Sequence, residues 1–222
     1  SSLQLGRSLC SDEEMLTTAK ENLKTSQLAI HMIPGFATVE RDLVKAIEWG
    51  VDLVRVAAHC TEADLTQRHI EYVRSQGKTV YGVLMMSHMV SSTRLLEEAR
   101  KMELYGAEGF IFMDSSGNYL PEEVKKRVQT LVDGLNIPVG FHGHNNLGMA
   151  VANSIAAIES GATILDGCAR GFGAGAGNTQ LEVLVAVLDR MGYKTGIDLY
   201  RLLDACDFAE KEIIPAVPTI NS

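Results

Sequence analysis

Short apolar runs alternate with longer amphipathic segments along most of the chain. The short runs are bounded by glycine, proline or polar residues, which is typical of buried strands, whereas the longer segments repeat apolar positions at helical spacing. The predicted strands are Gln27–Ile33, Asp52–Ala58, Thr79–Ser87, Gly109–Asp114, Ile137–His144 and Thr163–Cys168. The predicted helices that follow them are Thr38–Trp49, Thr61–Ser75, Ser91–Tyr105, Pro121–Leu135, Leu147–Ser160 and Asn178–Met191.

One predicted helix precedes the first strand, and another follows the last βα unit. Ser11, with Glu14 three residues later, forms a capping-box signature for a helix that reaches about Lys24. The last predicted helix is Asp198–Ile213. We therefore expect a single domain over residues 1–222, with a loop and helix over 1–25, six βα units over 26–194, and a helix and the start of a linker over 195–222.

The spacing of the predicted strands indicates a parallel sheet. The strands start near Leu28, Val51, Thr79, Gly109, Ile137 and Thr163, at separations of 23, 28, 30, 28 and 26 residues. Strands and helices that alternate at such a period form either an open doubly wound sheet or a (β/α)8 TIM barrel. The uniform period, and the lack of a Gly-x-Gly-x-x-Gly motif after the first strand, favour the barrel. Because only six strands are predicted, we expect an α/β fold in which the first two strands of the barrel are missing.

Composition narrows the possible partners and the compartment. The chain has 222 residues, 46% of them hydrophobic, and a net charge of -8 without any run of Lys and Arg, which argues against binding to nucleic acid or an anionic membrane. It shows neither an apolar run of about 20 residues nor a signal-peptide pattern, so we expect a cytoplasmic protein. The four widely spaced cysteines form no Cys-x-x-Cys pair, which argues against a zinc knot or a disulfide framework.

Polar residues gather at the predicted carboxyl ends of the strands, where TIM barrels carry their chemistry. Five of the six histidines lie there. The strand ends carry His31, His59 to Thr61, Ser87 and His88, Asp114 to Gly117, His142 to Asn145, and Gly171 to Asn178. This clustering predicts a functional site at that end of the barrel.

His142 and His144 are the leading candidates for metal ligands. Alternate side chains of a strand point to the same side, and the Cα atoms of residues i and i+2 lie roughly 6.5 to 7 Å apart. Two imidazoles at that spacing can bind one divalent ion, with oxygen ligands, water or substrate at the remaining positions. The competing interpretation is a pair of polar histidines that face solvent, but their place in the strand repeat favours the metal.

Other strand-end segments leave two interpretations open. Asp114–Gly117 could hold a ligand carboxylate or a metal-bound water, or form a loop whose Asp and Ser bond nearby amides, and the loop is favoured. The segment Gly171–Asn178 suits an anion or a close approach of substrate near a helix start, but it is also compatible with a bare turn. Asn178 itself could cap the next helix or supply an oxygen ligand.

Several polar residues are expected to have structural roles. Arg55 lies inside an apolar strand, so it requires a carboxylate partner, and a structural ion pair is the favoured interpretation. His59 and His88 are expected to be hydrogen-bonded loop histidines. Cys60 and Cys168 are expected to be buried thiols without a nucleophilic role.

Four motifs in the expected order resemble a known family. They are His-Gly-His-Asn-Asn-Leu-Gly at His142–Gly148, Val-Ala-Asn-Ser-Ile at Val151–Ile155, Arg-Gly-Phe-Gly-Ala-Gly-Ala-Gly-Asn at Arg170–Asn178, and Ala-His-Cys-Thr-Glu-Ala-Asp at Ala58–Asp64. On these motifs the chain from Ser26 to Ile213 resembles the 4-hydroxy-2-oxovalerate aldolases. That family belongs to a wider group with hydroxymethylglutaryl-CoA lyase and isopropylmalate synthase.

The resemblance implies a lyase that uses Mn²⁺ or a similar divalent ion. Its substrate would be a 4-hydroxy-2-oxo acid, cleaved to pyruvate and a short aldehyde such as acetaldehyde. His142 and His144 match the two histidine metal ligands of the family, and Asn178 matches an asparagine that ligates metal in some relatives. Ser115 matches a position that contacts the 2-oxo acid, and His142 is expected to contact it as well. The implied partners are an acylating acetaldehyde dehydrogenase and further copies of the chain.

The chain lacks part of the family's pattern. An Arg-Asp-Gly motif on the first strand supplies the family's aspartate ligand and an arginine that supports the enolate, and a candidate base histidine follows it; none of these is present. The catalytic residues therefore stay unassigned. We expect the 222 residues alone to bind metal weakly and to show no turnover.

Three alternatives remain at this stage. A Claisen-type relative would handle acyl-CoA, although the segment His59–Asp64 favours the aldolases. A Schiff-base aldolase would need a lysine, and none lies within the predicted strands. A non-catalytic barrel subunit would leave the His142 and His144 pair without a role.

Overall fold

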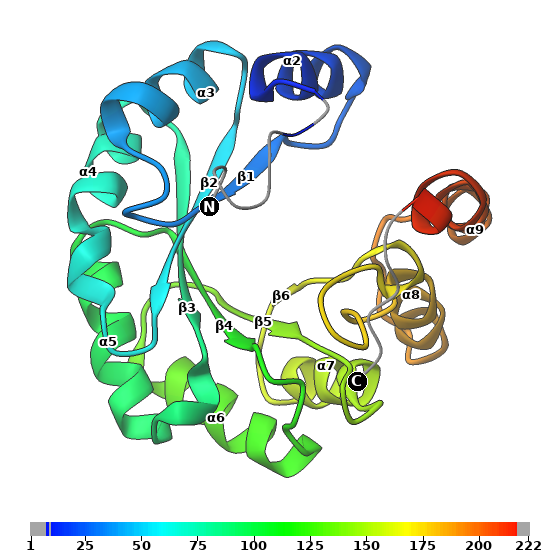
Figure 1. Ribbon diagram of the computed structural model, residues 1–222. Helices are drawn as coiled ribbons and strands as arrows, with labels where there is room; N and C mark the ends of the chain where they lie inside the picture. Colours follow the sequence, from blue (N-terminus) through cyan, green and yellow to red (C-terminus); the bar gives the residue numbers. More distant parts are fainter. Residues whose placement is uncertain (1–7, 9, 217–222) are drawn as a thin grey trace.

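Six parallel strands lie side by side in one sheet of the computed structural model, which describes residue 8 and residues 10–216. The sheet order follows the chain order, and the sheet curves into a half-barrel with helices along its outer face (Figure 1). The strands are β1 (Ala29–Met32), β2 (Leu53–His59), β3 (Thr79–Met85), β4 (Gly109–Asp114), β5 (Val139–Gly143) and β6 (Ile164–Leu165). This is a TIM-barrel-type α/β fold, as the strand spacing predicts.

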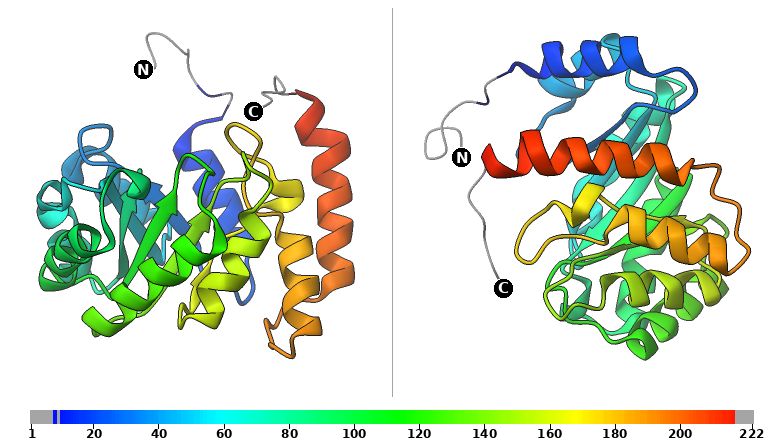
Figure 2. Two further views of the ribbon diagram at one scale, coloured as in Figure 1. Left: turned by 90° about the horizontal axis from the view of Figure 1, so that it is seen from below. Right: turned by 90° about the vertical axis from the view of Figure 1, so that its right-hand side faces the viewer.

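Helices separate the strands and continue after the last one. They are α2 (Asp12–Asn22), α3 (Val44–Glu48), α4 (Gln67–Ser75), α5 (Ser92–Leu104), α6 (Pro121–Gly134), α7 (Ala150–Glu159), α8 (Leu181–Arg190) and α9 (Leu199–Phe208). Short 3₁₀ or π turns are η1 (Val39–Leu43), η2 (Ala63–Thr66), η3 (Ser87–Met89), η4 (Ala169–Gly171), η5 (Ala209–Ile213) and η6 (Ile214–Ala216). Helices α8 and α9 pack beside each other (Figure 2).

Capping groups explain where helices α2 and α6 begin. The Ser11 hydroxyl accepts a hydrogen bond of 3.1 Å from the Glu14 amide, as the capping signature predicts. At the start of α6, Pro121 occupies the first turn, and the Glu123 carboxylate accepts a 2.9 Å bond from the Leu120 amide. Most of the predicted N-terminal loop, and the predicted linker after residue 216, lie outside the described residues.

Two of the differences between predicted and observed elements lie near the glycine-rich segment. The predicted strand Thr163–Cys168 is reduced to the two residues of β6, because the chain turns away after Asp166 and pairs Cys168 with Gln180 in an isolated bridge. Helix α8 begins at Leu181 rather than at Asn178. Asn178 is therefore not a helix cap. Its amide donates to the Gly171 carbonyl at 2.7 Å, and its backbone pairs with His144.

Alternate residues of each strand face two different apolar layers. On β2, Val54, Val56 and Ala58 point outward into the large core between the sheet and the helices. Residues of the opposite parity point to the concave face, where Ala57, Val83 and Ile111 are buried together. The inner layer is thus filled by small and branched side chains, which is the packing of a barrel interior rather than of an open channel.

Gly140 lets two isoleucines of the inner layer meet across β5. Register pairs Ile111 of β4 with Gly140, and Gly140 with Ile164 of β6. A Cβ atom at this glycine would lie 2.9 Å from Ile111 Cγ1 and 2.8 Å from Ile164 Cβ. The absence of a side chain at Gly140 is therefore a packing requirement of the concave face.

Among the described residues, none of the helices has the length and apolar character needed to cross a membrane.

Replacing Gly140 should destabilise the inner layer. In Gly140→Ala the new methyl group overlaps both isoleucines, so we expect the free energy of unfolding to fall by about 1–3 kcal/mol. Urea denaturation followed by circular dichroism measures this. The control is Leu104→Ala on α5, where the side chain is 82% exposed; its cost should stay within about 0.5 kcal/mol. Equal costs for the two variants would contradict the packing account.

Candidate active site

The imidazoles of His142 and His144 lie next to each other, edge to face, at the carboxyl end of β5. Their ring centroids lie 5.1 Å apart, with an angle of 63° between the ring planes. The intervening backbone is extended, so both side chains leave the same face of the strand. Phe141 points the other way and packs on Phe112, with ring centroids 5.2 Å apart. The predicted convergence of the two imidazoles is therefore present in the fold.

His142 contacts a partly buried ion pair between Arg55 and Asp166. Its Nδ1 lies 2.9 Å from Oδ2 of Asp166, the residue that follows β6. The same carboxylate oxygen accepts a 2.5 Å bond from the Arg55 guanidinium of β2. The side chains of Arg55 and Asp166 are only 20% and 17% exposed. The predicted carboxylate partner of Arg55 is confirmed, and it also contacts a predicted metal ligand.

Burial and nearby charges set the protonation of Asp166 and His144. Burial would raise the pKa of Asp166, but the hydrogen bond with His142 and the charge of Arg55 outweigh it and hold that pKa below its usual range. Burial, together with the neighbouring His142, lowers the pKa of His144 despite opposing effects of Ala174 and Asp114. Asp166 is therefore ionised, and His144 is held as the neutral imidazole that metals bind.

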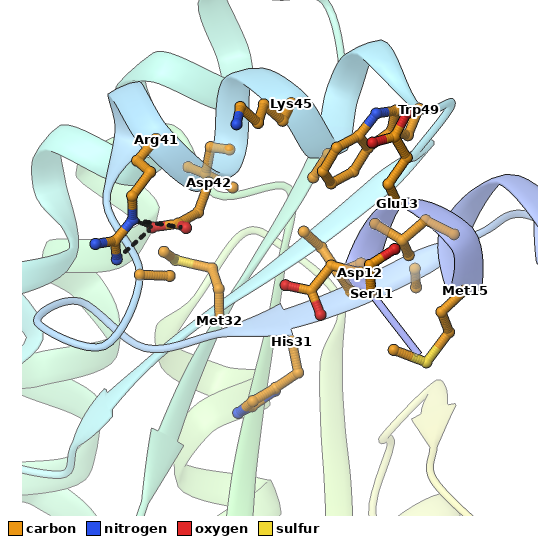
Figure 3. Close-up of a pocket in the computed structure, with 16 residues that line it drawn as sticks. Ser11, Asp12, Glu13, Met15, His31, Met32, Arg41, Asp42, Lys45 and Trp49 are labelled. Carbon is orange, nitrogen blue, oxygen red and sulfur yellow. Dashed lines mark hydrogen bonds and ion pairs between the residues drawn. The ribbon is translucent and has the colours of Figure 1, made fainter. Parts of the chain in front are cut away.

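His31 of β1 belongs to the same electrostatic environment. Burial, and then the charges of Arg55 and His142, lower its pKa well below the usual range, whereas Asp166 raises it. A pocket of about 700 Å³ lies between α2, β1 and α3, and Figure 3 shows the His31 imidazole pointing away from it. That pocket holds the Arg41–Asp42 ion pair, and its lining includes neither His142 nor His144. It is therefore separate from the candidate site.

The segment Asp114–Gly117 is a self-bonded loop, the interpretation that the sequence favours. Asp114 is buried, and its carboxylate accepts bonds from the Asn118 amide at 3.2 Å and the Tyr119 amide at 3.0 Å. The Ser115 hydroxyl accepts a 2.9 Å bond from the amide of Met86, which adopts a left-handed backbone with φ of 57°. Among the described residues the Ser115 hydroxyl donates no hydrogen bond, and its predicted contact with substrate stays a prediction.

The glycine-rich segment folds back on itself and on the loop after β5. The Asn145 amide donates to the Gly177 carbonyl at 2.8 Å, and Oδ1 of Asn146 accepts a 2.9 Å bond from the Ala176 amide. Within this segment, bonded amides belong to Gly171, Phe172, Ala176, Gly177 and Asn178. Most of the donors that an anion would need are thus used inside the protein, which favours a packed turn over an anion cradle.

Asn178 places an unused oxygen beside the histidine pair. It is the antiparallel bridge partner of His144, and side chains directly opposite in such a bridge leave the same face. Its Nδ2 donates to Cys168 Sγ at 3.2 Å and to the Phe172 carbonyl at 3.1 Å. Its Oδ1 is buried without a hydrogen-bond partner among the described residues. A buried amide oxygen with free lone pairs fits the expected ligand role.

These donors fit a divalent ion that accepts nitrogen and oxygen ligands. Two imidazoles and one amide oxygen suit a transition ion such as Mn²⁺ better than they suit a soft thiophilic metal. Over residues 8 and 10–216, no group of three His, Cys, Asp or Glu side chains comes together. A carboxylate ligand of the kind that the resemblance implies is therefore not found beside the two imidazoles among the described residues.

The remaining strand-end residues have other roles. His59 Nδ1 lies 2.9 Å from the Thr61 hydroxyl, as expected of a loop histidine. Nδ1 of His88 is buried without a hydrogen-bond partner in the described part of the chain, and hydrogen bonding through the other ring nitrogen stays a prediction. Burial raises the pKa of the Cys60 thiol, which donates to the Met86 carbonyl at 3.3 Å, and both features favour the expected structural role.

A curved parallel sheet with paired imidazoles at its strand ends places the chain among the TIM-barrel-type α/β proteins. Residues 5–209 match the model of the HMGL-like family. The chain belongs to this family. A solved structure of HMG-CoA lyase from Bacillus subtilis has the same fold, with a TM-score of 0.82 and 20% identity over 93% of this chain and 77% of that one.

Two curated relatives carry the name 4-hydroxy-2-oxovalerate aldolase. The protein of Pectobacterium atrosepticum is 62% identical over 221 residues, which are 100% of this chain and 64% of the relative. The protein of Spirochaeta aurantia is 64% identical over 222 residues, which are 100% of this chain and 65% of the relative. The chain thus spans slightly less than two thirds of the length of these relatives.

Two glycine variants separate steric overlap from backbone strain. Gly177 lies in the glycine-rich segment, and Gly148 lies outside it. A Cβ at Gly177, where φ is 95°, would lie 2.2 Å from the Gly171 carbonyl oxygen, whereas a Cβ at Gly148, where φ is 71°, meets nothing within 4 Å. Gly148→Ala should cost only strain, about 1–2 kcal/mol in the free energy of unfolding. Gly177→Ala should cost about 1–3 kcal/mol more. Denaturation midpoints measure both, and equal costs would contradict the close packing of Gly171 and Gly177.

Proposed function

We propose that the protein, in its natural length, is a divalent-metal-dependent aldolase. It would cleave 4-hydroxy-2-oxovalerate or a similar 4-hydroxy-2-oxo acid to pyruvate and a short aldehyde, acetaldehyde in the first case. The observation that carries the proposal is the pair of adjacent imidazoles at the end of β5, with Asn178 opposite His144 in an isolated bridge. The high identity to relatives named as this aldolase supports the choice of substrate class.

The ligands proposed for the metal are His142, His144 and Asn178, and Mn²⁺ is the ion we favour. A bound divalent ion would supply a Lewis acid that stabilises negative charge on the 2-oxo group as the C3–C4 bond breaks. Ser115 and His142 are the proposed contacts to the 2-oxo acid. Removal of the 4-hydroxyl proton needs a base, which we do not assign to any described residue.

We propose that the six strands are part of an eight-stranded barrel. Within the described residues, β1 and β6 each have a single neighbour in the sheet, which leaves two strand edges to be covered. The greater length of the relatives supports additional barrel strands that carry the missing carboxylate ligand and base. The proposed limits within this domain remain 1–25 before the first strand, 26–194 for the six βα units and 195–222 after them.

The cellular location and the partners that we propose follow from the four thiols and from the resemblance. The four cysteines are unpaired, which favours a reducing compartment and supports a cytoplasmic location. An acylating acetaldehyde dehydrogenase would receive the aldehyde, and the chain itself would form oligomers.

Removing either imidazole should weaken metal binding strongly and abolish cleavage. In the natural-length protein, His142→Ala and His144→Ala should each weaken Mn²⁺ binding in a calorimetric titration by at least about 100-fold, since even loss of an outer-shell partner costs about 10- to 100-fold. Pyruvate release, coupled to lactate dehydrogenase, should fall to background.

The matched control is His59→Ala, which removes an imidazole that bonds Thr61. This variant should bind Mn²⁺ and release pyruvate like the wild type. Unchanged metal binding in His142→Ala and His144→Ala would favour a non-catalytic barrel. Cleavage of an acyl-CoA substrate in place of the hydroxy-oxo acid would favour the Claisen-type alternative.

The 222 residues alone should be inactive. With two imidazoles and one amide oxygen as the only assigned ligands, we expect weak Mn²⁺ binding and no release of pyruvate in the coupled assay. The natural-length protein is the positive control. Pyruvate release by the 222 residues would show that the carboxylate ligand and the base lie within them.

A further inference from the structure

We propose that Asp166 is a positioning residue that holds His142 in the orientation and tautomer needed to bind metal, and that Arg55 keeps Asp166 in place. The geometry points to a chain of three hydrogen-bonded side chains: Arg55 of β2, Asp166 directly after β6, and His142 of β5. The part of this proposal that concerns metal affinity rests on the proposed function. The part that concerns the tautomer of His142 does not.

The backbone places Asp166 beside His142. Phe141 of β5 and Leu165 of β6 are register partners, so the next residues along each strand, His142 and Asp166, are neighbours. The Asp166 amide donates to the Phe141 carbonyl at 3.2 Å, which continues the pairing one residue past β6. Alternation then directs both side chains to the concave face, where Oδ2 of Asp166 meets Nδ1 of His142 at 2.9 Å.

The chemistry of a carboxylate determines which imidazole nitrogen carries hydrogen. An ionised carboxylate only accepts hydrogen bonds, so Nδ1 of His142 must be the donor. In the neutral ring Nε2 then has a free lone pair. Histidine ligands of metals commonly donate their other N–H to a carboxylate, which fixes the ring and raises its basicity. Asp166 provides that acceptor for His142.

Arg55 explains why Asp166 can be ionised and ordered inside the half-barrel. An unpaired carboxylate with only 17% of its side chain exposed would carry a large desolvation cost. The Arg55 guanidinium, from β2, donates to the same oxygen that faces His142. Because Arg55 and His142 share Oδ2, the carboxylate is held from two sides and has little freedom to rotate away from the imidazole.

A purely structural ion pair makes a different prediction. If Asp166 served only to neutralise Arg55, replacing both residues together would leave the state of His142 unchanged. If Asp166 positions His142, the double replacement changes that imidazole even when the fold is intact. The variant Arg55→Met/Asp166→Ala tests this, because it avoids the unpaired buried arginine that Asp166→Ala alone would create.

The first measurement is the tautomer of His142 in the metal-free, natural-length protein. Long-range ¹H–¹⁵N spectra of labelled histidine are recorded at about pH 8.5, roughly two units above the ordinary imidazole pKa. We expect hydrogen on Nδ1 in the wild type, and on Nε2 for most molecules of Asp166→Ala and of the double variant. The control is Asp52→Asn, which breaks the distant Lys20–Asp52 ion pair and should leave the spectrum of His142 unchanged.

The second measurement is Mn²⁺ affinity by calorimetry for the same variants. Asp166→Ala and the double variant should bind about 10- to 100-fold more weakly than the wild type, whereas Asp52→Asn should bind normally. Hydrogen on Nδ1 of His142 in the folded double variant would overturn the positioning role. Wild-type affinity in that variant would overturn it as well.

The two measurements also separate this proposal from the proposed function. If the wild type binds no Mn²⁺ but its His142 shifts tautomer in the Asp166 variants, the positioning role stands and the metal-dependent aldolase does not. If the wild type binds Mn²⁺ and the tautomer never changes, the positioning role fails alone.

Discussion

The carboxylate of Asp166 joins parts of the sheet that are 111 residues apart in the sequence. Arg55 approaches it from β2 and His142 from β5, so this one side chain connects an early strand with the strands that carry the imidazole pair. Removing any member would leave a buried polar group without its partner, which is the costly outcome for buried charges. The concave face of the half-barrel therefore depends on this contact both for its stability and for the arrangement of its site.

Two glycines shape the rest of the site, because the lack of a side chain lets neighbouring residues pack closely against them. Gly140 lets Ile111 and Ile164 close the inner layer below the histidines. Within the glycine-rich segment, the backbone of Gly177 packs against the carbonyl of Gly171. This close contact brings Asn178 opposite His144. The site is thus built by a rigid strand end and a tightly folded loop, as expected when donors must be held before a ligand arrives.

Much of the fold could be predicted from the hydrophobic pattern. Strand β4 matches its predicted limits, Gly109–Asp114, because apolar residues fill it and polar residues end it abruptly. Strand β6 does not match, since the apolar run Thr163–Cys168 continues past the point where the backbone leaves the sheet. Hydrophobicity reports burial, and burial alone does not determine where strand pairing stops.

The candidate site was predicted in part. The alternation of His142 and His144 is a local property, so the sequence reveals it. Asp166 was missed because it lies inside an apolar run and its partners come from distant strands. The signal that pointed to it was Arg55, a cation in an apolar strand that required a carboxylate. The sequence predicts the need for such a partner, but only the fold identifies it.

The central claim is that one cation is shared by two imidazoles at the end of β5. Pulsed electron paramagnetic resonance of Mn²⁺ bound to the natural-length protein, labelled with ¹⁵N at histidine, tests it most directly. The account predicts hyperfine coupling to two ¹⁵N nuclei, and the loss of one of them in His144→Ala. Bound Mn²⁺ that shows coupling to no histidine nitrogen, or a spectrum that His144→Ala leaves unchanged, would contradict it.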